Sequence, residues 1–357
     1  MQSRVRHVVA VLVAVVAGAH GAAAQEHIAL RSDVLFYGDN TEFCNPFRDG
    51  ETILGAAVRV SADVETGART VLSLGGFFNQ RFGSDRGVEQ ARPVVALSVR
   101  GRRSTFTFGT LPPRADKTPA GPDRAGPHGL LPPLQRDTLA FERPYEAGFQ
   151  WTFAGAALRH EMWLVWQRLN TAEHRERFDA GVDAELGAAR AVSVPLQLHV
   201  VHEGGQLFPS GPVGDSTAAA AGVNVHGRAG PLDRASVETY ALISRFGPDR
   251  SRPELSRDGV AFFGRAAAER GSLRAHVIVW RGRDFIKWEG DPNYLSVFAN
   301  GRRYHGTRDY AEAGITRRFR LSASALLDVS GRFHRVENHY EYSYRVTSIV
   351  GVGWRLR

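Results

Sequence analysis

The sequence is poor in several features that would assign it to common protein classes. It contains one cysteine among 357 residues, Cys44, which excludes an intrachain disulfide. Beyond the N-terminal segment it has no run of about eighteen apolar residues, and this excludes helices that span a membrane. Charge blocks, heptad repeats, low-complexity tracts and Pro/Ser-rich linkers are also lacking, so nothing marks a domain boundary. These absences favour a single domain.

The N-terminal segment has the pattern of a secretory signal peptide. Arg4 and Arg6 precede an apolar run from residue 8 to residue 16, and small residues follow up to Ala24. This order of a basic start, a short apolar stretch and small residues predicts cleavage near Ala24. The alternative is a single membrane anchor, although the apolar stretch is short for a helix that spans a bilayer. The predicted mature chain is residues 25–357.

The formal charge of the chain is +8. A basic chain can bind nucleic acid, but the arginines here are spread over strands and turns, and secretion removes that partner. Phosphate-binding loops, zinc ribbons and dinucleotide fingerprints are not found, so the sequence predicts no cofactor. The charge therefore needs another explanation.

Strict alternation of apolar and polar residues near the C-terminus is the strongest signal in the chain. Within residues 320–334, Leu327 and Val329 share one parity with Phe333, whereas the other parity is polar. A second alternating segment covers residues 342–356. Successive side chains of a strand point to opposite faces, so each segment has one apolar face and one polar face. Strands of soluble proteins usually run about five or six residues, and those that cross a bilayer need roughly nine to eleven. The length therefore favours membrane strands.

The same alternation occurs along the whole chain. We expect sixteen strands, or fourteen if the weak first and fifth segments fail, at about 28–36, 52–62, 70–80, 93–100, 105–110, 147–153, 157–168, 178–186, 191–202, 218–226, 235–246, 258–268, 273–282, 308–316, 320–333 and 342–356. Short turns alternate with long loops between them. Such alternation predicts a barrel with one plain rim and one elaborate rim.

In these features the chain resembles the porin-like outer-membrane β-barrels of Gram-negative bacteria. The resemblance is architectural and covers everything after the signal peptide. It implies an all-β fold, a transmembrane antiparallel up-and-down barrel in the outer membrane, with short turns and both termini in the periplasm. It also implies that the longest loop, 111–146, folds into the lumen. A lid over the outer mouth or a contact with another subunit are the alternatives for this loop.

Two sets of charged residues are candidates for a pore lining. If the apolar parity faces lipid, basic residues point inward at Arg265, Arg274, Arg320, Arg332, Arg345 and Arg355, and acidic residues point inward at Glu161, Asp179, Asp183 and Glu185. On a sixteen-stranded ring the two sets lie on opposite walls, which predicts a transverse field across a water-filled lumen. The alternative is that these charges pair locally. The candidate constriction residues in the long loop are Arg114, Lys117, Asp123, Arg124, His128 and Arg136.

Catalytic and metal-binding residues give a weaker signal. The predicted last loop, 334–341, contains His334, Glu337, His339 and Glu341, and Ser343 lies close to His339. Barrel hydrolases of the outer membrane use a His and a Ser on neighbouring strands near the outer rim. However, no Asn or Asp in a position to orient the histidine is evident, and two histidines five residues apart do not define a metal geometry. The sequence alone thus predicts neither a catalytic nor a metal site.

The sequence therefore favours a channel of porin type and no enzyme. The arginine excess suggests small polar, preferentially anionic solutes, or export of an acidic polysaccharide. Outer-membrane lipid is the expected surrounding partner, and homo-oligomers are allowed. The alternative is a closed barrel whose extracellular loops bind a surface partner or act as a lipid-modifying hydrolase. Strand number bears on the choice, since barrels of about eight to twelve strands tend to be filled by side chains, whereas sixteen strands leave an aqueous channel.

Overall fold

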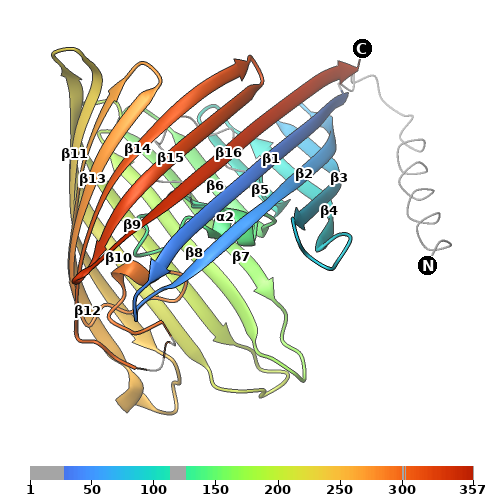
Figure 1. Cartoon of the computed structure of the whole chain (residues 1–357). Helices are drawn as coiled ribbons and strands as arrows, with labels where there is room; N and C mark the ends of the chain where they lie inside the picture. The colour runs from blue at the N-terminus through green and yellow to red at the C-terminus, as the bar shows by residue number, and fades with distance from the viewer. Residues whose placement is uncertain (1–27, 113–125, 300, 302, 357) are drawn as a thin grey trace.

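The computed structural model describes residues 28–112, 126–299, 301 and 303–356. The predicted signal peptide, residues 1–24, lies outside the described residues. Within them the chain forms one closed antiparallel barrel in which each strand pairs with its neighbours in sequence and β1 pairs with β16 (Figure 1). The expectation of sixteen strands in an all-β barrel is confirmed. None of the described helices is long and apolar enough to cross a membrane.

Most strands are longer than their sequence pattern suggested. They are β1 Ile28–Cys44, β2 Asp49–Gly67, β3 Thr70–Arg81, β4 Gln90–Arg100, β5 Ser104–Thr110, β6 Ala147–Ala154, β7 Leu158–Arg168, β8 Glu176–Leu186, β9 Val192–Gly204, β10 Gly214–Ala229, β11 Leu232–Gly247, β12 Arg257–Arg270, β13 Leu273–Arg283, β14 Thr307–Ser322, β15 Ala325–Val336 and β16 His339–Leu356. Among the described residues, three short helices lie in the connections: α2 Leu139–Glu142, η3 Pro253–Leu255 and η4 Pro292–Tyr294.

Alternation along each strand separates a lipid-facing surface from an interior. In β13, Val277 and Val279 are about half exposed, whereas Ile278 and Trp280 are buried. The same two-residue period holds in β9 and β11. Exposed apolar side chains on the outer surface of a barrel are what lipid requires, because water is absent there. Side chains of the other parity face the interior.

The connections at the two ends of the barrel differ in length, as expected from the sequence. Several boundaries were predicted wrongly. The predicted first long loop, 37–51, is mostly strand, since β1 continues to Cys44 and β2 begins at Asp49. Residues 320–322 belong to β14, and the turn is Ala323-Ser324 instead of 316–319. The alternation continues through this two-residue turn without a change of parity, which concealed it. The predicted last loop, 334–341, is also only a turn at Glu337-Asn338, because His334 and Glu341 are inside paired strands.

Two connections fold into the barrel. Leu130, Leu131 and Leu134 of the connection between β5 and β6 are fully buried, in one cluster with wall residues such as Trp163 and Tyr240. Phe285, Tyr294 and Leu295, from the connection between β13 and β14, belong to the same cluster. Across the lumen, Phe141 of α2 stacks on Tyr37 of β1 with ring centroids 5.0 Å apart. Figure 1 shows α2 within the ring of strands.

The two inward connections also bind one another. The amide of Arg136 donates to the carbonyl of Glu289 over 2.6 Å, and the amide of Asp291 donates to the carbonyl of Pro132 over 2.9 Å. We call residues 126–146 and 284–299 together the plug. Because its side chains pack against opposite walls, the plug reaches across the lumen at this level. The sequence had suggested an inward path for 111–146 but not for the second connection.

A charge on the lipid-facing surface tests this arrangement. Val277→Arg at the centre of β13 should lower the free energy of unfolding in a bilayer by about 2–4 kcal/mol, because arginine at the midplane loses its hydration. Denaturant titration in liposomes measures the difference. Leu207→Arg, in the exposed connection between β9 and β10, is the control and should change stability little. Equal effects of the two substitutions would mean that Val277 does not face lipid.

Candidate active site

Three polar residues lie side by side on the inner wall. They are on three consecutive strands, near the rim of the barrel that carries the longer loops. They are Glu312 on β14, His334 on β15 and Ser343 on β16, and all three are buried. Glu312 lies directly opposite His334 in the register of β14 and β15. Ser343 is two residues beyond Glu341, the partner of His334 on β16, and therefore has the same parity. The register of the barrel thus brings a hydroxyl, an imidazole and a carboxylate together.

The hydrogen bonds of this group fix the proton positions. His334 Nε2 lies 2.8 Å from Ser343 Oγ, and His334 Nδ1 lies 2.7 Å from the hydroxyl oxygen of Tyr310. The Tyr310 hydroxyl donates its own proton to Glu312 Oε2 over 2.6 Å. Its oxygen is therefore an acceptor toward His334, which places the imidazole proton on Nδ1. Nε2 is then left with a lone pair that faces the Ser343 hydroxyl.

Glu312 is held as an anion beside this histidine. Its Oε2 lies 3.5 Å from His334 Nδ1, so it acts both directly and through Tyr310. Its other oxygen, Oε1, is 2.7 Å from His276 Nε2 and 3.9 Å from Arg332 Nε. Phe43 packs edge-on against the His334 ring, with centroids 4.9 Å apart. A hydroxyl bonded to a histidine that a carboxylate orients is the arrangement of serine hydrolases.

From the sequence, Ser343 was noted beside His339 without a catalytic assignment, whereas the structure places it against His334. His339 begins β16 beside the turn, whereas His334 lies inside β15 and reaches Ser343 from the neighbouring strand. A carboxylate and a hydroxyl placed to orient His334 are those of Glu312 and Tyr310 on β14. Both share the inward parity of the predicted segment 308–316, and this was the available signal. Only the pairing of β14 with β15 shows that they meet His334.

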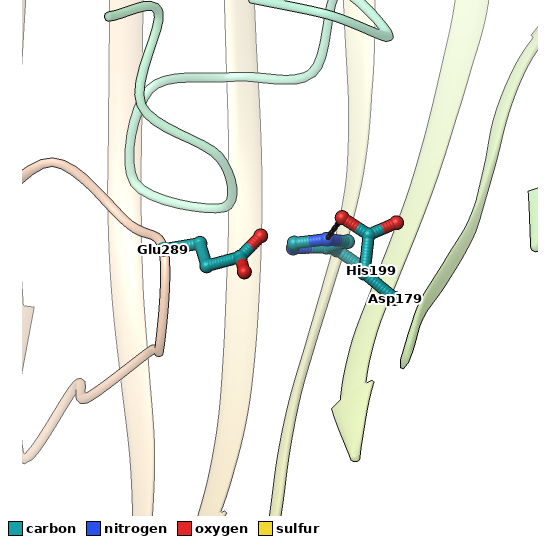
Figure 2. Close-up of side chains that lie close together, drawn as sticks. All are labelled: Asp179, His199 and Glu289. Atoms are coloured by element: carbon teal, nitrogen blue, oxygen red, sulfur yellow. Dashed lines mark ion pairs between the residues drawn. The ribbon is translucent and has the colours of Figure 1, made fainter. Parts of the chain in front are cut away.

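A second cluster of ligand-type residues lies between the wall and the plug. Asp179 of β8, His199 of β9 and Glu289 of the plug offer one atom each, and these atoms lie within 4.8 Å of one another. Figure 2 shows the two carboxylates on either side of the imidazole. His199 Nδ1 lies 2.9 Å from the Leu134 carbonyl, and Nε2 lies 3.5 Å from Asp179 Oδ2. Carboxylate oxygens and an imidazole nitrogen at this spacing are atoms that can ligate a metal ion.

The charges around this cluster are already balanced by protein groups. Arg143 and Arg177 bind the two oxygens of Glu289 over 2.8 Å and 2.9 Å. The Trp163 indole donates to Asp179 Oδ1 over 2.7 Å, and Gln167 donates to Oδ2 over 3.1 Å. A divalent ion would have to compete with these donors. The contacts therefore describe a tether that fastens the plug to β8 and β9.

The comparisons with known proteins identify a family from the sequence and a fold from the structure. A family model described as lipid A 3'-O-deacylase-type matches residues 20–350. The chain belongs to this family. No curated protein matches this family member by sequence.

Solved structures similar to this deacylase-family barrel are porins and other outer-membrane proteins. A loop-deletion mutant of OmpT of Vibrio cholerae has a TM-score of 0.54 at 10% identity, covering 92% of this chain and 100% of that chain. An anion-selective porin from Comamonas acidovorans gives 0.51 at 10% identity, with 92% and 100% covered. OccAB1 of Acinetobacter baumannii gives 0.52 at 9% identity, with 94% and 98% covered. At such identities the likeness concerns the fold. The chain is an outer-membrane β-barrel of Gram-negative type.

Family membership overturns the functional expectation from sequence. The predictions of a porin-type channel and of no enzymatic activity are wrong, since a deacylase-type family implies a hydrolase. Small anionic solutes and an acidic polysaccharide find no support as partners. The channel was inferred from the number of strands and from inward charges, and both are properties of the barrel wall. The alternation of residues along strands does not reveal the plug or its contacts.

The six candidate basic residues all have the inward parity, but most bind a nearby acid. Arg265 binds Glu238 over 2.7 Å, and Arg274 binds Glu269 over 3.0 Å. Arg332 and Arg345 both bind Asp137 of the plug. Arg320 and Arg355 lie toward the plain rim and are exposed. Most of these arginines in the deacylase-family barrel are therefore paired locally, as the alternative interpretation of the sequence had it, instead of forming a one-sided positive wall.

The four candidate acidic residues in this deacylase-family chain also have nearby partners. Glu185 binds Arg159 over 2.6 Å, and Asp183 accepts from Gln197 over 2.9 Å. Asp179 is in the tether, and Glu161 binds His128. Of the candidate constriction residues, His128 and Arg136 lie in the plug, and Arg136 binds Glu142 over 2.5 Å. The others, Arg114, Lys117, Asp123 and Arg124, lie outside the described residues.

His128 anchors the plug to the wall electrostatically. Its Nδ1 lies 2.8 Å from Glu161 Oε1 and its Nε2 lies 3.2 Å from Glu146 Oε2, while its ring stacks on Trp163 at 3.8 Å. Burial by itself lowers the pKa of His128, but Glu146 and Glu161 outweigh it and raise the pKa to about 10. His128 is therefore an imidazolium at neutral pH.

This anchor makes stability depend on alkaline pH. The pKa of His128 is raised above the ordinary 6.5, so its contribution is complete below about pH 6.5 and is lost as pH rises through 10. The free energy of unfolding of the wild type should fall over this range. In His128→Gln, which cannot titrate, that part of the fall should be missing. Denaturant titrations between pH 6 and pH 10.5 make the comparison, and parallel curves would contradict an imidazolium at His128.

Proposed function

We propose that this barrel is a serine hydrolase that removes an ester-linked acyl chain from lipid A, with Ser343 as nucleophile, His334 as general base and Glu312 as the group that orients the histidine. The observation that carries the proposal is the 2.8 Å contact from Ser343 Oγ to a His334 nitrogen whose proton is on the opposite side of the ring. The family description supplies the substrate and names the 3'-oxygen as the position of the ester.

The geometry supports acyl transfer to Ser343 as the first step. Ser343 Oγ attacks the ester carbonyl carbon while its proton moves to His334 Nε2. The imidazolium is stabilised by Tyr310 and Glu312, because Nδ1–H donates to the Tyr310 oxygen and the Tyr310 hydroxyl donates to the carboxylate. Collapse of the tetrahedral intermediate breaks the bond to the sugar oxygen. That oxygen takes the proton from Nε2, leaving an acyl-serine.

The second step regenerates the enzyme with the same groups. Water replaces the sugar hydroxyl, and His334 Nε2 takes its proton as it attacks the acyl-serine carbonyl. Collapse releases the fatty acid and returns the proton to Ser343 Oγ. His334 therefore acts as base and acid in turn, and this requires the Nδ1 proton to stay in place throughout. Tyr310 and Glu312 provide that constraint.

The depth of the site suits a lipid substrate. Ser343 is four residues from His339, where β16 begins beside the turn, which corresponds to about 13 Å along the strand. In outer-membrane barrels the rim with the longer loops faces outward, and lipid A forms the outer leaflet. The site thus lies at the level of the outer leaflet. The packed plug supports chemistry inside the barrel instead of conduction through it.

Removal of either reacting group tests the proposal. Ser343→Ala and His334→Gln should each lower kcat for fatty-acid release from lipid A by at least about 10³-fold, since nucleophile and base act as one unit. Mass spectrometry of the lipid product and of the free fatty acid measures the rate. Ser330→Ala, another buried inward serine on β15, is the matched control and should keep wild-type activity. Unchanged release in Ser343→Ala would exclude Ser343 as nucleophile.

The orienting groups should be separable from the reacting ones. Glu312→Gln should lower kcat by about 10²–10⁴-fold with little change in KM, because the imidazolium loses its counter-charge. Tyr310→Phe should have a smaller effect, since Glu312 Oε2 remains 3.5 Å from Nδ1. Steady-state kinetics on micellar lipid A compares them. If Glu312→Gln raised KM and left kcat unchanged, the carboxylate would bind substrate instead of orienting His334.

A further inference from the structure

Two arginines flank the proposed catalytic pair on the same inner wall. Arg332 is two residues from His334 on β15, and Arg345 is two residues from Ser343 on β16, so both share the inward parity of the catalytic residues. Their side chains are only 13% and 8% exposed. Two residues along a strand correspond to about 7 Å. A positive pair thus lies one step deeper than the nucleophile.

The partner of this pair comes from the plug. Asp137 Oδ2 accepts from Arg345 Nη1 over 2.5 Å and from Arg332 Nη1 over 3.3 Å. Burial by itself would raise the pKa of Asp137, but Arg345, Arg332 and Arg48 outweigh it and hold the pKa well below its usual range. Asp137 is therefore an anion that the plug inserts between the two arginines, immediately before α2.

The arginines are held in place by other contacts as well. Arg345 Nε binds Asp39 of β1, and its guanidinium lies over the Phe141 ring at 5.1 Å. Arg332 Nε lies 3.9 Å from Glu312 Oε1. If the Asp137 side chain turned away, both guanidinium groups would keep a wall partner and their position. Such a preformed pair of forked donors suits carboxylate and phosphate oxygens alike.

From this geometry we propose that Arg332 and Arg345 form the binding subsite for a phosphate group of the acylated sugar substrate, and that Asp137 occupies this subsite until the substrate phosphate displaces it. The inference rests on the proposed function and adds a recognition element to it. A phosphate and an ester on one sugar ring are separated by a distance of the same order as the step from Arg345 to Ser343. A bound phosphate would then place the ester near the nucleophile.

Occupation of the subsite by Asp137 also explains why a carboxylate of the plug lies beside the catalytic residues. A phosphate carries about −1.5 to −2 charges and three acceptor oxygens, against one charge and two oxygens for Asp137. It therefore outcompetes the carboxylate for two arginines, whereas a neutral sugar does not. In this arrangement Asp137 is a competitor built into the plug. The site opens for a phosphorylated lipid and stays closed to an uncharged one.

Binding in a chemically inactive background tests the subsite without requiring turnover. In Ser343→Ala protein in detergent, lipid A should bind at least about tenfold more tightly than the same lipid A after enzymatic removal of its phosphates. Adding Asp137→Asn should tighten lipid A binding by a further factor of about ten and leave the dephosphorylated lipid unchanged. Adding Arg332→Gln should abolish the preference for the phosphorylated lipid. Tryptophan fluorescence or calorimetry reports the affinities.

Matched controls separate local effects from general charge effects. Asp249→Asn, in an exposed loop, and Arg281→Gln, whose side chain is 79% exposed, should leave both affinities unchanged. Inorganic phosphate is the third probe, and it should compete with lipid A only weakly. Competition by inorganic phosphate at equal affinity would instead assign the arginines to free phosphate and overturn the lipid proposal.

The outcomes distinguish this inference from the proposed function. Equal binding of both lipids, or an Asp137→Asn variant with unchanged affinity, would overturn the subsite even if the enzyme hydrolyses lipid A. Conversely, the phosphate preference can be found while Ser343→Ala retains full activity in the wild-type background. That result would keep the subsite and reject the serine mechanism.

Discussion

Closure of the hydrogen-bonded barrel is the constraint on which the rest of the structure depends. In a bilayer every backbone amide and carbonyl needs a partner, and pairing β1 with β16 leaves no open edge among the strands. Closure also fixes parity, since each side chain must point either to lipid or to the interior. The apolar side chains take the outer face. The polar residues of sixteen strands are thereby collected in one enclosed volume.

Charges confined in this volume have to find partners there, and this explains the role of the plug. A buried charge without a partner is costly, and several wall residues have a partner on the inserted connections. Arg332 and Arg345 bind Asp137, and Arg177 binds Glu289. The plug is thus an electrostatic complement to the wall as well as an apolar filler. A barrel whose backbone resembles that of porins becomes a packed interior with a defined polar site.

The comparison with porins shows how little of the function lies in the backbone. The barrel superposes on an anion-selective porin over most of both chains at 10% identity, yet its family is one of deacylase type. The difference lies in side chains on a few strands and in two inward connections. On β14, β15 and β16, one inward residue from each strand builds a possible nucleophile, base and orienting group. Fold and function are therefore separate conclusions here.

The sequence by itself determined the barrel. A two-residue period is a local property, so the alternation in segments such as 273–282 identified strands and their lipid-facing parity without knowledge of any partner. Strand assignment from alternation failed at the turn Ala323-Ser324, because this turn interrupts neither the two-residue period nor the parity. The inward orientation of Arg332 and Arg345 could also be read from it.

Tertiary structure alone decided which inward residues meet. Glu312, His334 and Ser343 are far enough apart in sequence that only the register of three strands brings them within hydrogen-bond distance. Asp137 reaches Arg345 across 208 residues of chain because the plug folds back into the lumen. Register depends on the sum of pairings around the closed ring. Loop paths depend on the charged and apolar groups that line the interior. Neither is a local property, so neither can be read from an alternating pattern.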